Sequence, residues 1–292
     1  MSDKRSILIQ LDTDEHPSVF DRVVAVDSGV DQLFSYGGVK PEQAQALTHG
    51  AIFTRSPKSL HRTAVFVGGS DVTAAEKVLE KVKRAMIREA GLQVSVMLDP
   101  NGANTTAASA VCAAAKHMDL NHAHALILGG TGPVGQRVAR LLAKRDANVR
   151  IGSRSLERAE AVCGAIRTRV PGAKLEAVAT ASSGDGPAAL EGRDLVIAAG
   201  AAGALLLPKK IRTGCDSLRV AIDLNAVPPA GIEGIEVMAQ GAERDGVISY
   251  GAIGVGDGKM RIHRAAIAKL FESNDQVLDA EEIYDLALSL DV

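Results

Sequence analysis

Short apolar runs alternate with amphipathic stretches over the first hundred residues. The pattern predicts strands at 6–11, 51–54, 63–67 and 93–98, and helices at 18–26, at 41–47 and from 70 or 71 to about 90. Alternation of this kind is typical of a mostly parallel sheet with helices on its faces. We therefore expect a smaller N-terminal α/β domain over residues 1–104.

The same alternation continues through the second part of the chain. Strands are predicted at 125–128, 148–151, 175–178, 194–198, 218–224 and 247–251, and helices at 136–144, 157–168 and 261–271. This order predicts a doubly wound parallel sheet of the Rossmann type over 105–262. An alanine-rich helix at 106–117 would connect the two domains. Residues 263–292, whose last helix opens with a capping box at 279–282, are expected to pack back on the first domain.

A glycine-rich turn follows the buried strand at 125–128 and comes directly before a helix. Gly130 is expected to allow a tight turn, Gly132 to let the backbone approach a pyrophosphate, and Gly135 to let the helix pack closely on the strand. The N–H groups at the start of that helix would face the phosphates. An ordinary strand-to-helix turn is the alternative. The candidate cofactor residues here are Gly130, Thr131, Gly132, Pro133, Val134 and Gly135.

The next strand of this domain ends without the acidic residue that holds the ribose 2′-hydroxyl in NAD-selective folds. Ser153 and Arg154 stand there instead, and a hydroxyl and a guanidinium suit a 2′-phosphate. NADP is therefore favoured over NAD, although an arginine stacked on adenine would accept both, and Arg158 is a second candidate. A solvated loop arginine is the alternative. After a later buried strand, the small residues Ala199 and Gly200 would leave room for the nicotinamide ribose.

Composition narrows the class of protein. No apolar run approaches the roughly 18 residues that span a bilayer. The net charge of −2 is mixed along the chain, so neither a membrane nor nucleic acid is an expected partner. The three cysteines are widely separated, which fits reduced thiols better than a disulfide framework or a metal site. We expect a soluble, cytoplasmic enzyme without a metal.

Common catalytic motifs are missing from the sequence. It contains no HExxH, no GxSxG, no cluster of Cys and His, and no Ser-Tyr-x-x-x-Lys set. A hydride-transferring enzyme without an evident acid or base suggests a reaction that needs no proton relay at the reacting carbon.

Two further segments are candidates for binding a substrate. Asn101 and Asn104 belong to a polar, turn-forming run at 99–106, which we expect at the mouth of an interdomain cleft. The alternative is that they only form turns and cap a helix. Lys259 ends a predicted glycine-rich loop at 252–259.

Several segments, spread from end to end of the chain, together resemble one family. They lie at 10–14, 17–21, 101–107, 130–135, 223–226, 251–254 and 270–273. On these motifs the chain is similar to the bacterial NAD(P)-dependent methylene-tetrahydromethanopterin dehydrogenases of methylotrophs. The likeness is closest to the B-type enzyme, which serves formaldehyde oxidation and accepts NAD or NADP, whereas the A-type is restricted to NADP.

The resemblance implies oxidation of 5,10-methylene-tetrahydromethanopterin to the methenyl cation. Hydride would pass directly from the N–CH₂–N carbon to C4 of the nicotinamide, which accounts for the absence of an acid and a base. The protein would position the two carbons and tolerate the developing positive charge, the latter with help from Asp21 or another carboxylate of the N-terminal domain. The resemblance also implies a homo-oligomer, either a trimer or a hexamer.

Individual site residues follow from the same resemblance. Thr105 and Lys259 fall at positions expected to line the pterin site, where Lys259 would hold a pterin carbonyl or pair with a carboxylate. A solvated loop lysine is the alternative, and Phe20 would pack either on the pterin ring or in the core. The candidate catalytic residues are Asp21, Thr105 and Lys259, the candidate substrate-binding residues are Phe20, Asn101, Asn104, Thr105 and Lys259, and Asn225 and Ile253 join the cofactor-binding residues.

Two other functions stay open. One is a related enzyme, methylene-tetrahydrofolate dehydrogenase or a shikimate-type reductase. The other is a module that senses NADP(H) without turnover. Assays with folate and methanopterin substrates side by side distinguish these functions.

Overall fold

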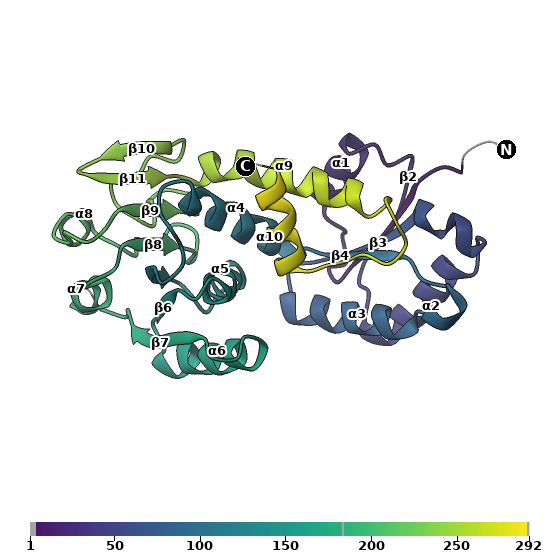
Figure 1. The fold of residues 1–292 in the computed structure, drawn as a ribbon, viewed down its shortest axis with the longest axis horizontal. Coiled ribbons are helices and arrows are strands. Elements are labelled where there is room, and N and C mark those ends of the chain that lie inside the picture. The colour runs from purple at the N-terminus through teal and green to yellow at the C-terminus, as the bar shows by residue number, and fades with distance from the viewer. Residues whose placement is uncertain (1–3, 183, 291) are drawn as a thin grey trace. The chain divides into compact units, whose positions relative to one another are not determined.

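The computed structural model describes residues 4–182, 184–290 and 292, and the chain divides into two compact units. Unit 1 contains the chain up to Thr105 together with Met260–Leu290, and unit 2 contains Thr106–Lys259. Each unit has a sheet of its own with helices on its faces (Figure 1). The predicted α/β class and the Rossmann-type sheet are confirmed.

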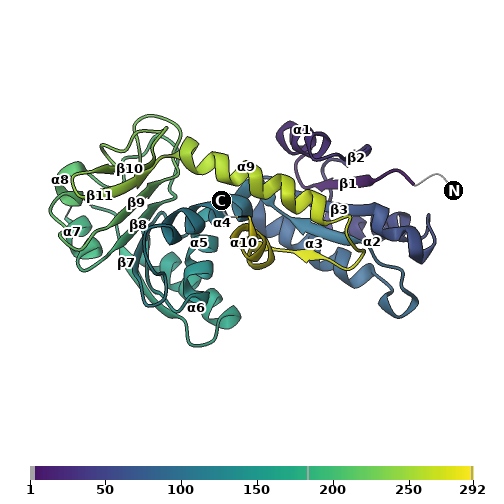
Figure 2. The ribbon, with the colours of Figure 1, turned by 45° about the horizontal axis from the view of Figure 1, so that its top comes forward.

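Unit 1 is built on a five-stranded parallel sheet. Its elements are β1 Ile7–Asp12, α1 Val19–Asp27, β2 Gln32–Tyr36, α2 Pro41–Ile52, β3 Thr63–Gly68, α3 Val72–Ala85, β4 Ser95–Leu98, β12 Val277–Leu278 and α10 Ala280–Ser289, with 3₁₀ turns at Pro57–Arg62, Arg88–Ala90 and Pro100–Gly102. The strand order is β12-β4-β3-β1-β2. Helices α2 and α3 lie on one face and α1 on the other (Figures 1 and 2).

The core of unit 1 packs α2 and α3 against the sheet. The central strand β3 is buried at every position because helices cover both faces. Each fully buried aliphatic side chain stabilises the fold by roughly 1.5–3 kcal/mol. The main buried residues of this core are Leu11, Val39, Ile52, Leu60, Val65, Val67, Val78, Leu79, Val82, Val94, Val96 and Leu98.

Unit 2 is built on a seven-stranded sheet in which only one edge strand is antiparallel. Its elements are α4 Ala103–Ala115, which begins in unit 1, then β5 His124–Leu128, α5 Pro133–Lys144, β6 Asn148–Ser153, α6 Leu156–Arg169, β7 Lys174–Ala179, α7 Asp185–Leu190, β8 Leu195–Ala198, α8 Lys209–Arg212, β9 Val220–Asp223, β10 Gln240–Arg244, β11 Val247–Tyr250 and α9 Ala252–Lys269, which ends in unit 1. The strand order is β10-β11-β9-β8-β5-β6-β7, with β10 antiparallel to β11.

The order of strands in unit 2 reverses between β5 and β8. Nucleotides bind to sheets of this kind at the carboxyl ends of the two strands that flank the reversal. Both strands are almost entirely buried, and helices lie on both faces (Figure 2). Among the described residues, none of the helices combines the length and the apolar character needed to cross a membrane.

The structure departs from the predicted elements in both units. Residues 51–54, predicted as a strand, contain the end of α2, which buries Ala51 and Ile52 against the core. The edge strand β2 was missed because its side chains are only half-buried or exposed, so it lacks an apolar run. Residues 252–259, predicted as a loop, form the first turns of α9.

Candidate active site

The glycine-rich turn joins β5 to α5 as the sequence predicts, but the structural roles of its glycines differ from the predicted ones. Gly129 has the positive φ of 69°, so it makes the turn that was expected of Gly130. A Cβ on Gly130 would lie 2.8 Å from Ile151 Cγ2, so packing on β6 is what excludes a side chain there. A Cβ on Gly135 would lie 2.7 Å from Gly130 Cα, and its predicted role in close helix packing is confirmed.

The amino-terminal end of α5 points to an anion. Gly132 is the N-cap residue and Pro133 opens the helix, and within the described residues no side chain caps it. The first N–H groups of a helix lack partners inside it and carry a partial positive charge. Thr131 and Val134 flank these groups, and the Thr131 hydroxyl lies 3.5 Å from the Ser153 hydroxyl. These residues fit the diphosphate of a dinucleotide.

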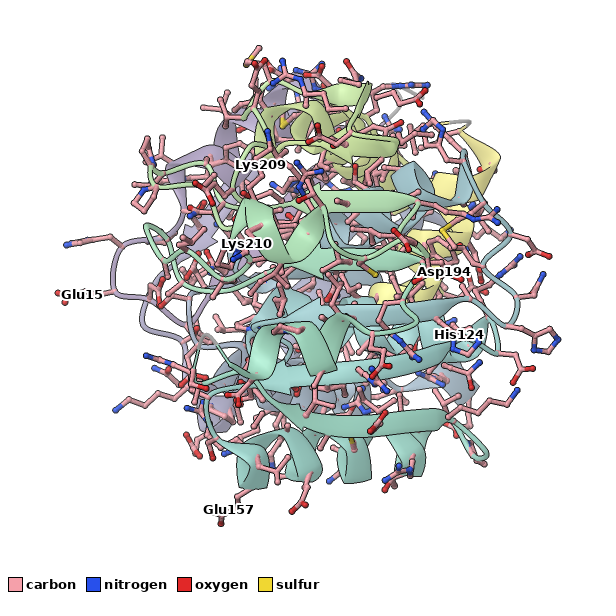
Figure 3. All side chains as sticks on the ribbon, turned by 90° about the vertical axis from the view of Figure 1, so that its left-hand side faces the viewer. Glu15, His124, Glu157, Asp194, Lys209 and Lys210 are labelled. Carbon is pink, nitrogen blue, oxygen red and sulfur yellow. The ribbon has the colours of Figure 1, made fainter. Side chains whose placement is uncertain are left out.

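The end of β6 offers a hydroxyl and a guanidinium. Ser153 is buried, and its Oγ accepts a hydrogen bond from Ser155 N–H at 3.2 Å. Arg154 is exposed, and in the described part of the chain its guanidinium makes no hydrogen bond or ion pair. Arg158 is exposed on the first turn of α6, and Glu157 beside it projects outward from that helix (Figure 3). Arg154 is therefore available to a phosphate.

The loop after β8 meets the glycine-rich turn at the point where the strand order reverses. A Cβ on Gly129 would lie 2.5 Å from Gly200 Cα, and one on Gly200 would lie 2.6 Å from Leu206 Cδ1. Ala199 N–H donates to Leu128 O at 2.8 Å, which ties the two loops together. Small residues are required here by the close approach of the two loops.

The loop after β9 is shaped by Asp223. This side chain is 2% exposed, and its two oxygens accept hydrogen bonds from Asn225 N–H and Ile232 N–H at 3.0 Å each. Burial raises the pKa of Asp223. The Asn225 side chain donates to Pro229 O and accepts from Val227 N–H, each at 3.0 Å, so it shapes its own loop.

The carboxyl ends of the strands of unit 1 are joined by a second set of polar contacts. Asp12, at the end of β1, is fully buried and accepts from Asp14 N–H and Ser18 N–H at 2.9 and 3.0 Å. Asp14 in turn accepts from Ser70 N–H and Oγ–H at 3.0 and 2.8 Å, which links this loop to the loop after β3. Ser18 then caps α1, the helix that carries Phe20 and Asp21.

Asp99 orders the turn between β4 and α4. Its Oδ1 accepts from Asn104 N–H and Thr105 N–H at 2.8 and 3.1 Å, and its Oδ2 accepts from Thr105 Oγ1–H at 2.7 Å. Asn104 donates from Nδ2 to Leu98 O at 2.6 Å and to Asp279 Oδ1 at 2.9 Å. Asp99, Asn104 and Thr105 are all 0% exposed, whereas Asn101, with a φ of 53°, is exposed on the turn.

The candidate residues on α1 and α9 differ in exposure. The Phe20 ring is 48% exposed, and Asp21 is almost entirely buried. Ile253 is 42% exposed on the first turn of α9, and Lys259 is half-buried further along the same helix. Gly254 lies inside this helix, where a Cβ would overlap Ala239 O, so a side chain is excluded at this position.

One buried residue near these groups was not predicted as a site residue. His263 on α9 is 0% exposed, with Nε2 4.0 Å from Asp21 Oδ1 and Nδ1 4.0 Å from Asp99 Oδ2. Asp12, Asp99 and Asp223 were likewise not among the predicted site residues. The signal for these three aspartates was a single acid placed directly after an apolar run, but His263 had no such signal.

Comparisons of the sequence point in one direction. A family described as methylene-tetrahydromethanopterin dehydrogenase, N-terminal, matches residues 19–101. The bifunctional protein MdtA of Methylorubrum extorquens is 43% identical over 97% of this chain and 98% of its own length. The NAD(P)-dependent methylenetetrahydromethanopterin dehydrogenase of the same organism is 31% identical over 98% of this chain and 99% of its own length.

The two relatives also correct one expectation. The resemblance singled out the B-type enzyme that accepts either nucleotide. The relative whose name states that dual dependence shares fewer residues with this chain than the bifunctional protein does, 31% against 43%. The expectation of closest likeness to the B-type is therefore wrong.

Solved structures resemble this chain in fold alone. Quinate dehydrogenase from Corynebacterium glutamicum in complex with NAD has a TM-score of 0.52 at 13% identity, covering 98% of this chain and all of that one. Shikimate 5-dehydrogenase from Listeria monocytogenes has a TM-score of 0.52 at 12% identity, covering 97% and 96%. At such low identity they show a shared fold and leave the substrate to other observations.

Proposed function

This chain belongs to the methylene-tetrahydromethanopterin dehydrogenase family, and we propose that it oxidises 5,10-methylene-tetrahydromethanopterin to the 5,10-methenyl cation, with NADP or NAD as hydride acceptor. The observation that carries this proposal is the 31% identity to the NAD(P)-dependent methylenetetrahydromethanopterin dehydrogenase over nearly the full length of both chains, because it covers both units. The uncapped start of α5, at the reversal of strand order in unit 2, supports the nucleotide half of the reaction.

The chain's own residues account for the binding of the nucleotide. N–H groups at the start of α5 hold the diphosphate, and Gly129, Gly132 and Gly200 keep the surrounding backbone free of side chains. Ser153 and Arg154 bind the 2′-phosphate of NADP, and the absence of an acid at the end of β6 removes the group that would repel it. Ala199, Asn225 and Ile253 line the nicotinamide half. When bound, the oxidised nicotinamide supplies an electrophilic C4.

The proposed hydride transfer does not require a general acid or a general base from the protein. The bridging carbon loses hydride directly, and the lone pair of the neighbouring nitrogen stabilises the amidinium that forms. The protein must hold two carbons within reach, which is worth up to roughly 7–11 kcal/mol in favourable cases. It must also tolerate positive charge where that charge develops. We assign the second task to the Asp21 carboxylate.

The residues of unit 1 divide into those that touch the pterin and those that position others. Phe20 and Asn101 are exposed, so we assign them to direct contact with the pterin. Asn104 and Thr105 are fully buried and bonded to Asp99, so their proposed part is to hold the turn that bears Asn101. Lys259 holds a pterin carbonyl or pairs with a carboxylate, because a cation beside a developing cation would not assist the reaction.

We further propose that the chain forms a homo-oligomer, a trimer or a hexamer, through α1 and β2. Val19, Val23 and Val26 lie on one side of α1 and are 67%, 54% and 61% exposed. The neighbouring edge strand β2 exposes Phe34 and Tyr36 at 45% and 44%, and its outer backbone groups have no strand beside them in the sheet. Exposed apolar side chains and an open strand edge are both typical of protein interfaces.

We place the reaction in one-carbon metabolism, as a step of formaldehyde oxidation in the cytoplasm. The three free cysteines, Cys112, Cys163 and Cys215, support a reducing compartment.

The test is a steady-state assay of the purified chain with NADP and with NAD, following the reduced nucleotide and the methenyl product by absorbance. Turnover of methylene-tetrahydromethanopterin supports the proposal. Turnover of methylene-tetrahydrofolate alone would favour the folate enzyme. No turnover with either pterin, together with measurable NADP(H) binding, would favour a sensing module.

A further inference from the structure

His263 is enclosed by groups that favour a positive charge on its ring. The ring is fully buried, with a carboxylate oxygen 4.0 Å from each nitrogen, Asp21 Oδ1 on one side and Asp99 Oδ2 on the other. The Phe66 ring stacks on it with a centroid distance of 5.8 Å and an interplanar angle of 12°, and the Phe20 ring lies 6.1 Å away. An aromatic face within about 6 Å attracts a cation.

Burial and charge pairing oppose each other at this ring. Burial alone disfavours an imidazolium. A carboxylate oxygen 4.0 Å from each ring nitrogen, however, favours the imidazolium by charge pairing. A proton on both ring nitrogens directs one N–H toward each carboxylate. The surroundings therefore favour the protonated form.

The two carboxylates are held to different degrees. Asp99 accepts three hydrogen bonds, two from backbone N–H groups and one from the Thr105 hydroxyl, so it is a fixed anion at the end of β4. Asp21 lies on α1 next to the exposed Phe20. His263 thus stands between a rigid carboxylate in the core and a second carboxylate at the side where we place the pterin.

The helix that carries His263 also carries Lys259. The two residues are four positions apart on α9, so their side chains lie on the same side of the helix. Charged residues beside the imidazole include Asp21 on α1 and Asp99 after β4. Lys259 lies on the same side of its own helix, and Asp279, before α10, is linked to Asp99 through Asn104. Strand β3 contributes the uncharged ring of Phe66.

We propose that His263 is a positioning residue for hydride transfer, which in its protonated form holds the Asp21 carboxylate beside the substrate and is itself held by Asp99. The proposal rests on the function proposed above. Asp21 touches the substrate and stabilises the methenyl cation as it forms, whereas His263 acts only through Asp21. Loss of the imidazolium removes the positive charge 4.0 Å from the Asp21 carboxylate, so Asp21 binds a proton more readily and loses its charge at a higher pH.

The test compares His263→Gln with the wild type and with His124→Gln as matched control. His124 is exposed at the start of β5, at the opposite end of that strand from the glycine-rich turn (Figure 3). In His263→Gln we expect kcat to fall at least tenfold while KM for NADP changes less than twofold. We also expect the acid limb of the kcat profile to move up by about one pH unit or more, which is a tenfold change in proton affinity. His124→Gln is expected to match the wild type. An unmoved acid limb in His263→Gln would overturn the proposal.

A second measurement keeps the test open if His263→Gln does not fold. In wild-type protein labelled with ¹⁵N-histidine, NMR follows the seven histidine rings through a pH titration. We expect one ring to stay doubly protonated well above the pH at which the exposed rings lose a proton, and Asp21→Asn to lower that pH. If all seven rings are neutral at pH 8, or if Asp21→Asn changes none of them, the proposal is wrong. The NMR titration needs no turnover. It therefore tests the pairing of His263 with Asp21 even if the wild-type enzyme proves inactive, which would be a failure of the proposed function.

Discussion

Aspartates at the carboxyl ends of strands shape the loops that carry the candidate site. Asp12, Asp99 and Asp223 are each at most 2% exposed, and each accepts hydrogen bonds from backbone N–H groups of the loop that follows. Hydrogen bonds from several N–H groups replace the water that a buried carboxylate loses. The three side chains therefore fix loop conformations, and the residues that contact ligands lie next to them.

We propose that the choice of nucleotide depends on Arg154. For Arg154→Ala we expect KM for NADP to rise about tenfold or more, because a hydrogen bond to a charged group is worth roughly 1.5–3 kcal/mol. KM for NAD should change less than about threefold, since NAD has no 2′-phosphate. Steady-state kinetics with both nucleotides measures the two effects, and Arg158→Ala on the next turn serves as the control. An equal rise for both nucleotides would show that Arg154 does not read the phosphate.

The three cysteines should differ sharply in reactivity. Burial raises the pKa of the Cys112 thiol to about 12 and also raises that of Cys163, and both side chains are buried. At pH 8 a thiol with a pKa near 12 is ionised to about 10⁻⁴, and only the thiolate reacts. In the native protein we therefore expect iodoacetamide to label the half-buried Cys215 first. Peptide mass spectrometry measures this order, and early labelling of Cys112 would contradict it.

At the scale of elements, the glycines of α9 show why composition alone misleads. The three glycines at 252–259 suggested a loop, yet the segment is helical from Ala252. A Cβ on Gly254 would overlap Ala239 O, and one on Gly258 would lie 2.6 Å from Ser109 Oγ. These glycines let the helix pack closely against β10 and α4, a requirement that depends on tertiary contacts.

Two substitutions in the same helix separate packing from flexibility. Gly254→Ala should destabilise the protein by about 1–3 kcal/mol, as overpacking does. Gly256→Ala, where a Cβ meets nothing within 4 Å, should stabilise it by about 0.5–1 kcal/mol through the helix preference of alanine. Urea unfolding followed by circular dichroism measures both. If both variants were stabilised, close packing at Gly254 would be refuted.

Elements with continuous apolar runs were predicted well and edge elements were not. β3, β5 and β8 are buried over almost their whole length, so their sequences mark them directly. β2 lies at a sheet edge with alternate side chains exposed, and the two-residue β12 forms only because β4 offers a partner. Ala51 and Ile52 are apolar because the end of α2 is buried, and a short apolar run does not distinguish strand from helix.

At the scale of the molecule, unit 1 is assembled from both ends of the chain. β12 pairs with β4, Ser95 Oγ donates to Ser273 O at 3.0 Å, and Asn104 donates to Asp279 at 2.9 Å. The capping box that opens α10, with Asp279 and Glu282, was predicted and is confirmed. The last helix could therefore be predicted from its local sequence, whereas the pairing of β12 with β4 could not, because it depends on a long-range contact.

Oligomer formation gives a prediction at this scale. Val26→Lys places a charge in the proposed interface of α1 and should shift the protein toward monomer, since a buried unpaired charge is costly. Analytical ultracentrifugation at several concentrations measures the shift. Leu288→Lys on α10, where the replaced side chain is 47% exposed, is the control and should leave the assembly unchanged. A Val26→Lys protein with the wild-type mass would rule out α1 as an interface.

The candidate site was predictable where it is local in sequence. The nucleotide loop is a strand, a turn and a helix in succession, so one segment contains its pattern. Arg154 could be predicted because it stands at the end of the strand that follows the glycine-rich turn. His263 gave no signal, because Asp21, Asp99 and His263 come from three distant segments and meet only through packing. Asn104 and Thr105 were expected to contact a ligand, but packing buries both of them, and they stabilise a turn instead.

The central claim is that hydride leaves the one-carbon bridge of a reduced pterin and goes directly to a nicotinamide held by unit 2. It is tested most directly with 5,10-methylene-tetrahydromethanopterin deuterated at the bridging carbon and either nucleotide in ordinary water. Mass spectrometry of the reduced nucleotide should find one deuterium per molecule. Deuterium released to the solvent, or no reduced nucleotide at all, would contradict the account.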